Sequence, residues 1–181
     1  MKKIFVFIFF FLSFNLYAQE IKFEKIVDSF DKPWSLSFID EKNIIITEKS
    51  GKLYTFNLKN KKISEIKHNL SVLEVGQGGL LDVLYHEQKV YISYSENRGD
   101  WKTSTSVAKG IFDQKNIKFK NIFQAEPPID SGYHFGSRLV IKDKHLYITA
   151  GERGKGMIAQ DAKQHPGSII RINIDGSIPK D

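Results

Sequence analysis

Short runs of β-branched and aromatic residues recur along this chain in groups of four. The first group is Leu36–Phe38, Asn43–Thr47, Gly51–Leu58 and Ile63–Ile66. The second is Leu80–Val83, Lys89–Ser95, Thr105–Phe112 and Ile117–Phe123, and a third begins with Arg138–Ile141, His145–Thr149 and Gly167–Ile174. Gly, Asn, Asp and Lys separate the runs, a pattern typical of strands joined by turns.

The spacing of these groups predicts how the strands assemble. The second strands of successive groups start 46 and 56 residues apart, which is the spacing of propeller blades with loops of variable length. We therefore expect an all-β chain, a β-propeller of four-stranded antiparallel blades. A β-sandwich is the alternative, but it does not require the recurrence.

Residues 19–181 are expected to supply blades 1 to 3, with the third blade incomplete. An open ring leaves unpaired strand edges, so the chain is interpreted as the N-terminal portion of a longer protein, with a dimer of half rings as the alternative. The segment Ile21–Val27 resembles the fourth strand of a blade. In a closed ring it would complete the last blade.

The first 18 residues have the pattern of a secretory signal peptide. Lys2 and Lys3 precede the apolar block Ile4–Leu12, and Ala18 is the expected cleavage site. The block is too short to span a bilayer comfortably, so we expect a periplasmic or secreted protein with no stable membrane insertion after cleavage; an uncleaved anchor is the alternative. The sequence has no cysteine, so packing alone must hold the exported fold together.

The positive charge of the chain is expected to be surface charge. The formal net charge is +6, and removal of the two signal-peptide lysines lowers it to +4. The remaining lysines alternate with apolar residues, as on solvated strand faces. No nucleic-acid partner is predicted.

Two glycine-rich segments are the candidate functional sites. His134 lies in Gly132–Ser137 just before an apolar run, and Gln77 lies in Gly76–Gly79 before the matching run one group earlier. Both would enter the innermost strand of a blade, on the side that carries the long loops 96–104 and 152–166. Gln77 and His134 should therefore converge at a channel mouth, with the loop residues, including Arg153, around its rim.

Simpler interpretations compete for several residues. His134 and Gln77 could be ordinary turn residues, and Arg138 is expected to pair with an acid of the neighbouring blade such as Asp82. Trp34 is assigned to packing, whereas Trp101 on a long polar loop could reach substrate. No metal site is assigned: Glu152, Asp161 and His165 match no ligand spacing, and Asp175–Pro179 is too short for an EF-hand loop and is expected to be a turn.

Taken together, the motifs resemble those of the PQQ-dependent soluble aldose sugar dehydrogenases. The resemblance rests on Pro33–Phe38, Gly76–Val83, Tyr91–Ser95, His134–Leu139, Gly151–Gly154, Ala159–Asp161 and Ile169–Pro179. It implies a six-bladed propeller, with His134 as general base and Gln77 near cofactor and sugar. The implied reaction oxidises an aldose to its lactone by hydride transfer to PQQ and passes electrons to an external acceptor.

The resemblance also implies what this chain lacks. The calcium ligands and the cations that hold the carboxylates of PQQ are expected beyond Asp181, so the chain alone should be inactive. Two other function classes stay open, a metal-dependent propeller lactonase and a non-catalytic propeller binding module.

Overall fold

A computed structural model describes residues 20–180 of the chain. The expected signal peptide, residues 1–18, lies outside the described residues. Among the residues that are described, no helix is long and apolar enough to cross a membrane.

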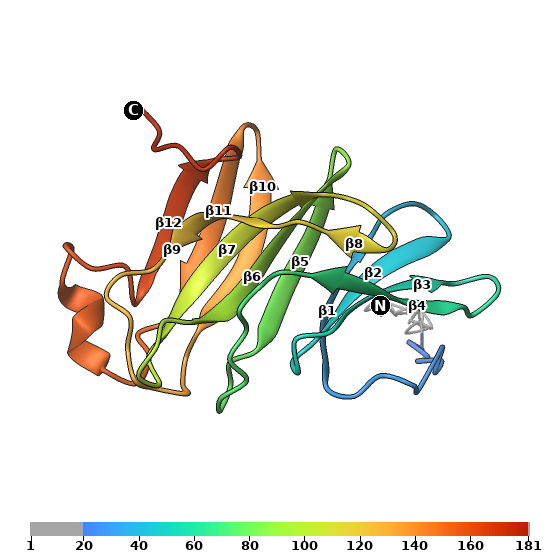
Figure 1. Cartoon of the computed structure of the whole chain (residues 1–181), viewed down its shortest axis with the longest axis horizontal. Coiled ribbons are helices and arrows are strands. Elements are labelled where there is room, and N and C mark those ends of the chain that lie inside the picture. The colour runs from blue at the N-terminus through green and yellow to red at the C-terminus, as the bar shows by residue number, and fades with distance from the viewer. Residues whose placement is uncertain (1–19, 181) are drawn as a thin grey trace, which may run out of the picture.

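The chain forms three antiparallel sheets that follow one another along the sequence (Figure 1). The first contains β1 (Pro33–Phe38), β2 (Asn43–Glu48), β3 (Leu53–Asn57) and β4 (Ile63–His68). The second contains β5 (Leu80–His86), β6 (Lys89–Asn97), β7 (Thr103–Ile111) and β9 (Lys120–Gln124), and the third contains β10 (Gly136–Lys142), β11 (His145–Ala150) and β12 (Ser168–Asn173). The remaining elements are β8 (Asn116–Ile117) and the short 3₁₀ helix η1 (Gly156–Gln160). The predicted all-β class is confirmed, and so is the grouping of the strands except for the segment Ile117–Phe123.

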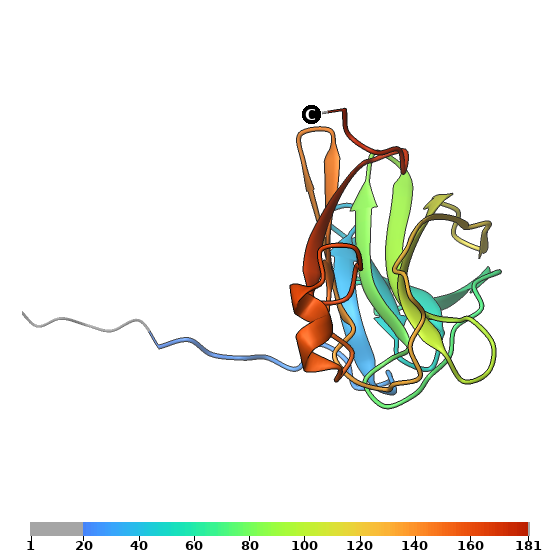
Figure 2. The same ribbon diagram turned by 90° about the vertical axis from the view of Figure 1, so that its left-hand side faces the viewer.

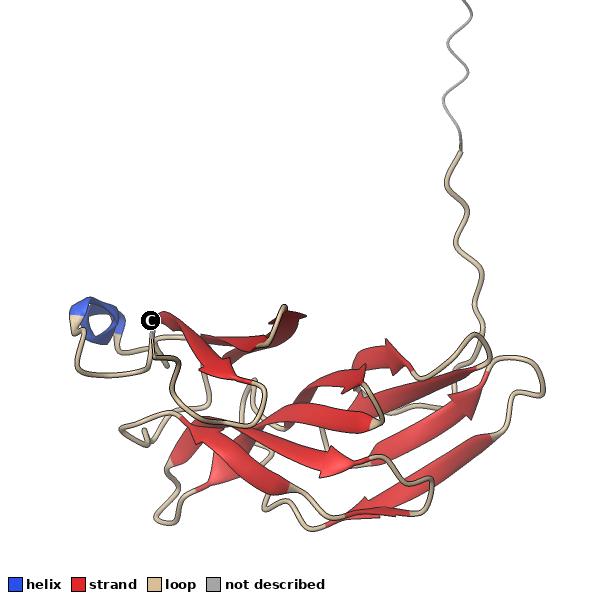
Figure 3. Cartoon of the chain, turned by 90° about the horizontal axis from the view of Figure 1, so that it is seen from above, coloured by secondary structure: helices blue, strands red, loops and turns tan. Residues whose placement is uncertain are grey.

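Apolar side chains hold adjacent sheets together face to face. Because successive strand residues point to opposite faces, Ile45 of β2 is buried against the second sheet, where it joins a cluster with Leu80 and Ile92. Tyr91 of β6 points the other way and is buried with Leu146 and Ile148 of the third sheet. The second sheet is thus apolar on both faces, and the sheets lie side by side when the molecule is seen from above (Figure 3).

The expected single strand Ile117–Phe123 is instead divided between two sheets. β8 pairs in parallel with β4 of the first sheet, and β9 pairs with β7 of the second. Between them, the side chain of Asn69 accepts a hydrogen bond from the Phe119 nitrogen at 2.8 Å and donates one to the Phe119 oxygen at 3.1 Å. Ile117 is fully buried in the core between the two sheets. Two effects therefore divide the segment between the sheets: the burial of the Ile117 side chain, and the hydrogen bonds from the Asn69 side chain to the backbone of Phe119.

Ile21–Val27 forms no strand within the described residues, and its expected place in the last blade of a closed ring stays a prediction. Residues 20–26 run as an extended segment away from the sheets (Figure 2), and Phe23 is 97% exposed. Val27 and Phe30 then pack against the first sheet. A strand requires a neighbouring strand to satisfy its backbone groups. No strand among residues 20–180 pairs with this segment.

Asp82 connects the first strands of all three sheets. It lies on β5, is 6% exposed, and accepts hydrogen bonds from the Ser35 hydroxyl of β1 at 2.5 Å and from the Leu139 nitrogen of β10 at 2.8 Å. Its carboxylate also pairs with Arg138 of β10 at 3.2 Å, which confirms the predicted ion pair. Because one buried carboxylate joins the three innermost strands, it fixes the relative positions of the loops that enter them.

Candidate functional site

His134 lies in the tight turn that leads into β10. Its φ angle is +49°, an uncommon conformation for a residue with a side chain and one found often at functional sites. The carbonyl group of His134 packs directly against Gly151, where any side chain would collide with it. The turn therefore holds the histidine in a strained conformation, with about half of its side chain exposed (51%).

Gln77 lies in the corresponding turn before β5 and contacts the His134 turn directly. The Gln77 nitrogen donates to the Gly132 oxygen at 2.6 Å, and the His134 nitrogen donates to the Gln77 side-chain oxygen at 2.9 Å. A side chain on Gly76 would collide with the Gly132 carbonyl group, so the absence of one at position 76 permits the close approach. Two residues 57 positions apart in the sequence are thereby brought together.

These two residues line one pocket at the start of the innermost strands. The pocket contains about 520 Å³ of space, counting its open mouth, and is lined by Trp34, Gln77, Leu81, His134, Phe135 and Gly136. Each of the three sheets contributes, through β1, β5 and β10 or the turns before them. The convergence expected from the sequence is therefore present, although the roles of the individual residues stay predictions.

Glu152 is the partner of the His134 ring. Its carboxylate contacts His134 Nδ1 and accepts a hydrogen bond from the Gly154 nitrogen at 3.1 Å. The hydrogen bond with His134 is the main cause that lowers the pKa of Glu152 below its ordinary value, so the carboxylate is charged at neutral pH. A proton on Nδ1 that is donated to this carboxylate leaves Nε2 free to accept one.

The sequence does not single out Glu152 as a partner of His134, since Glu152 appears there only with Asp161 and His165 as residues that match no metal-ligand spacing. The signal that could have identified it is its position, one residue past Gly151, against which the His134 turn packs. A carboxylate there follows β11, the neighbour of the strand that His134 precedes.

Arg153 is buried beneath the site rather than exposed on its rim, which corrects the expectation from loop length. It is 3% exposed. Its guanidinium donates to the Tyr133 oxygen at 2.9 Å, to the oxygen of Thr103 at 3.1 Å, to the Thr103 hydroxyl at 2.6 Å and to the Ser131 oxygen. It also stacks at 3.6 Å from the ring centre of Phe135. Arg153 therefore holds the backbone that leads into His134 and the side chain of the residue that follows it, and burial lowers its pKa to about 10.

The two tryptophans occupy different places. Trp34 lines the pocket with His134, and the Arg138 guanidinium stacks 4.3 Å from its ring centre. Trp101 is 74% exposed and lines a separate hollow with Leu73 and Asn97. The structure does not bring Trp101 into the pocket of Gln77 and His134, so its contact with substrate stays a prediction.

Glu152, Asp161 and His165 each bond to a different part of the chain. His165 Nδ1 accepts a hydrogen bond from the Glu126 nitrogen at 2.9 Å, and Asp161 bonds to the Lys163 nitrogen of its own loop. Within residues 20–180, no group of three or more His, Cys, Asp or Glu side chains could hold a metal ion. The Asp175 side chain bonds to the Ser177 nitrogen at 2.9 Å, so this segment is a turn, as predicted.

The pocket lining has the chemistry to contact one part of a quinone cofactor. It offers a histidine acceptor, a carboxamide and the aromatic ring of Trp34, which suit a planar ring and a hydroxyl group. The six lining residues include no lysine or arginine. Cations for the carboxylates of PQQ would have to come from elsewhere.

The chain is similar to known sugar dehydrogenases over nearly its whole length. Residues 30–181 match the family model described as glucose / sorbosone dehydrogenase. The chain is 32% identical to the aldose sugar dehydrogenase YliI of Escherichia coli, covering 89% of this chain and 46% of that protein. It is 28% identical to quinoprotein glucose dehydrogenase B of Acinetobacter calcoaceticus, covering 91% and 42%.

Solved structures agree with the fold. The crystal structure of the soluble aldose sugar dehydrogenase from Escherichia coli in the apo form matches with a TM-score of 0.82 at 32% identity, covering 87% of this chain and 48% of that one. The PQQ-bound aldose sugar dehydrogenase of Streptomyces coelicolor matches in fold, with a TM-score of 0.74 at 20% identity. The chain spans about half the length of these relatives and corresponds to about half of a six-bladed propeller.

Proposed function

This chain belongs to the glucose / sorbosone dehydrogenase family, and we propose that its pocket contributes to a PQQ-dependent site that oxidises the anomeric carbon of aldose sugars to lactones. The observation that carries the proposal is the contact between Glu152 and His134 Nδ1, beside Gln77 in one pocket. That arrangement is suited to general-base catalysis.

His134 would take the proton in this reaction. With Nδ1 donating to Glu152, Nε2 accepts the proton of the anomeric hydroxyl as the carbonyl bond forms at that carbon. The Glu152 carboxylate stabilises the positive charge that then develops on the imidazole, because the two groups are in direct contact. PQQ, when bound, supplies the acceptor for the hydride that leaves the same carbon.

Gln77 would orient the sugar or the cofactor. Its side-chain oxygen is occupied by the His134 nitrogen at 2.9 Å, so its amide group is fixed in direction. The nitrogen of that amide makes no hydrogen bond within residues 20–180 and is the donor available to a ligand. Trp34 would supply aromatic surface.

The remaining parts of the proposal concern the cellular setting. The signal-peptide pattern of residues 1–18 supports export to the periplasm or beyond, where an external acceptor would take the electrons. Calcium would assist cofactor binding through ligands that residues 20–180 do not supply as a cluster.

The test is reconstitution with PQQ and calcium. The chain by itself and a form extended to the full length of its relatives are each titrated, and dye-linked oxidation of glucose and other aldoses is measured. The extended form should gain activity, and His134→Ala should lower it about 10²- to 10⁴-fold. Hydrolysis of lactones that depends on a divalent ion without PQQ would instead support a lactonase. If the protein showed neither activity, the binding-module hypothesis would remain.

A further inference from the structure

A further hollow lies at the junction of the first two sheets, at the opposite end of the strands from His134. It is lined by Ile39, Asp40, Asn43, Thr55, Asn57, Asn60, Lys62, Ser64, Phe112 and Gln114, with about 540 Å³ of space counting its open mouth. Trp34, at the start of β1, lines the His134 pocket, whereas Ile39 and Asp40 follow the end of the same strand. The two sites are therefore separated by the length of a strand.

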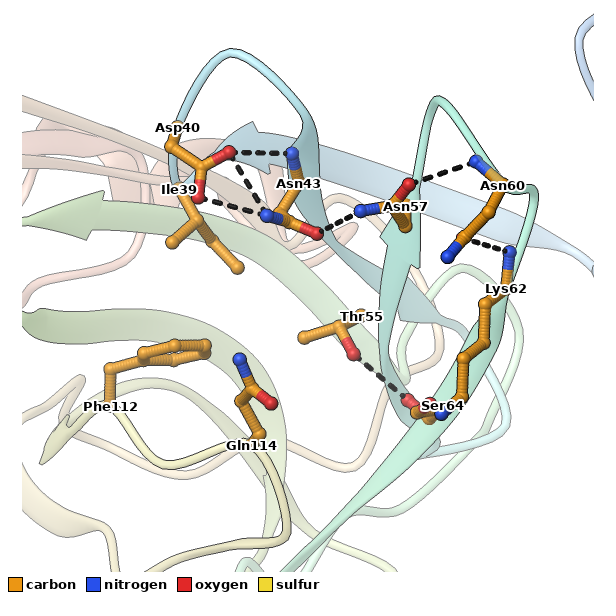
Figure 4. A pocket seen from close by; sticks show the side chains of 10 residues that line it. All are labelled: Ile39, Asp40, Asn43, Thr55, Asn57, Asn60, Lys62, Ser64, Phe112 and Gln114. Atoms are coloured by element: carbon orange, nitrogen blue, oxygen red, sulfur yellow. Dashed lines mark hydrogen bonds between the residues drawn. The ribbon is translucent and has the colours of Figure 1, made fainter.

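One wall of the hollow is a chain of hydrogen-bonded polar side chains (Figure 4). The Asp40 carboxylate accepts two hydrogen bonds from the side-chain nitrogen of Asn43, at 2.9 and 3.0 Å. The side-chain oxygen of Asn43 in turn accepts a hydrogen bond from the side-chain nitrogen of Asn57 at 2.8 Å. The side-chain bond from Asn43 is the main cause that lowers the pKa of Asp40, which keeps this carboxylate charged. These bonds fix the wall before any ligand arrives, which reduces the entropy lost on binding.

Other polar groups of the hollow have no partner in the protein. The side chains of Lys62, Ser64 and Gln114 make no hydrogen bond or ion pair through their terminal atoms among residues 20–180. Lys62 and Ser64 lie on one side and Gln114 lies across from them, next to the Phe112 ring (Figure 4). They offer an ammonium, a hydroxyl and a carboxamide to a molecule between them.

An apolar surface completes the hollow. The Phe112 ring is held edge-on against Tyr85, with ring centres 5.5 Å apart, and Ile39 packs beside it on the core between the two sheets. The only charged lining residues are Asp40 and Lys62, and their charges cancel. The hollow thus carries no net charge and sets hydroxyl-binding groups opposite an aromatic ring. This arrangement matches a compact ligand with hydroxyls on its edges and C–H groups on its face.

We propose that this hollow binds a neutral sugar ring, either a free monosaccharide or the end of a glycan, at a site separate from the His134 pocket. Phe112 contacts the face of the ring, and Lys62, Ser64 and Gln114 bond to its hydroxyls. The lining residues lie on the first sheet and its turns, except Phe112 and Gln114, which lie in the loop between β7 and β8.

The test is an NMR titration of this chain with methyl α-glucoside. This probe has no free anomeric hydroxyl, so it is not a substrate for oxidation at the His134 pocket. Millimolar affinity is expected for a ligand of this size, with the largest shifts at Phe112, at the Gln114 amide and at the backbone of Lys62 and Ser64. Absence of saturable shifts, or shifts centred on His134, would overturn the proposal.

Two exposed lining residues provide the variants. Lys62→Ala combined with Gln114→Ala should weaken binding about tenfold, because two hydrogen bonds are lost. Lys59→Ala is the matched control, since Lys59 lies on the same turn but does not line the hollow. Equal weakening by the control would contradict the assignment. So would tighter binding of glucuronate or inorganic phosphate than of the glucoside, because the hollow would then select charge.

Discussion

Replacing Arg153 by Met tests whether neutral groups can stabilise a buried guanidinium. No carboxylate pairs with Arg153 among residues 20–180. Burial lowers its pKa from 12.5 to about 10, which corresponds to a cost of about 3 kcal/mol for the charged form. Met keeps much of the aliphatic volume while removing the charge and every donor.

Four hydrogen bonds and one ring contact oppose this cost. Hydrogen bonds to a charged group contribute roughly 1.5 kcal/mol or more each, and the stack on Phe135 adds about 1 kcal/mol. The net expectation is that Arg153→Met lowers the free energy of unfolding by about 3–4 kcal/mol, equivalent to a fall in Tm of about 10 °C for a chain of this size.

The assay is urea unfolding of the chain at neutral pH, followed by tryptophan fluorescence and circular dichroism. Lys67→Met is the control, because it removes a cation that is 74% exposed and paired with Glu65 at 2.6 Å; such pairs contribute roughly 0–1 kcal/mol. A change in the free energy of unfolding of less than about 1 kcal/mol for Arg153→Met would refute the reasoning. It would mean that the hydrogen bonds of the guanidinium do not outweigh the cost of burying its charge.

Three further predictions follow from the other contacts. Asp82→Ala should lower the free energy of unfolding by about 2–3 kcal/mol, since it leaves the buried nitrogen of Leu139 without an acceptor; urea unfolding measures this, and a change below about 0.5 kcal/mol would contradict it. Glu152→Gln should lower sugar oxidation by the extended, PQQ-loaded protein about 10- to 100-fold, as loss of an orienting partner does elsewhere; unchanged steady-state kcat would show that the contact with His134 is incidental. Because the folded-state pKa of Glu152 is lowered, its contribution to stability is complete above the unfolded-state pKa near 4.5 and is lost as the pH falls through the lowered value. Glu152→Gln should therefore weaken the acid dependence of stability, and identical acid unfolding curves for the two proteins would refute the link.

Much of the fold could be predicted because its signals are local. Short runs of β-branched and aromatic residues between turn residues specify strands, as in β6, and the recurrence of four such runs specifies the sheets. The ion pair of Arg138 with Asp82 was also predictable, because both residues lie on innermost strands of neighbouring sheets. Strand ends were less certain: β7 begins two residues earlier than expected, at Thr103.

Two segments depart from their local pattern because their structure depends on distant partners. Ile21–Val27 has the composition of a strand but lacks a pairing strand among residues 20–180. Ile117 is drawn to the first sheet by burial, and Asn69, 50 positions from Phe119, completes its backbone bonds. Nothing in the local pattern of either segment contains this information.

For the site, the sequence by itself determined which residues are chemically able to act and which turns carry them: His134 and Gln77 between glycines, each before an innermost strand. Only the tertiary structure decided what surrounds them. It placed Glu152 against the His134 ring and buried Arg153 beneath the turn. The reason is that strand patterns are set by neighbours along the chain, whereas the environment of a loop side chain is set by whichever sheets pack against it.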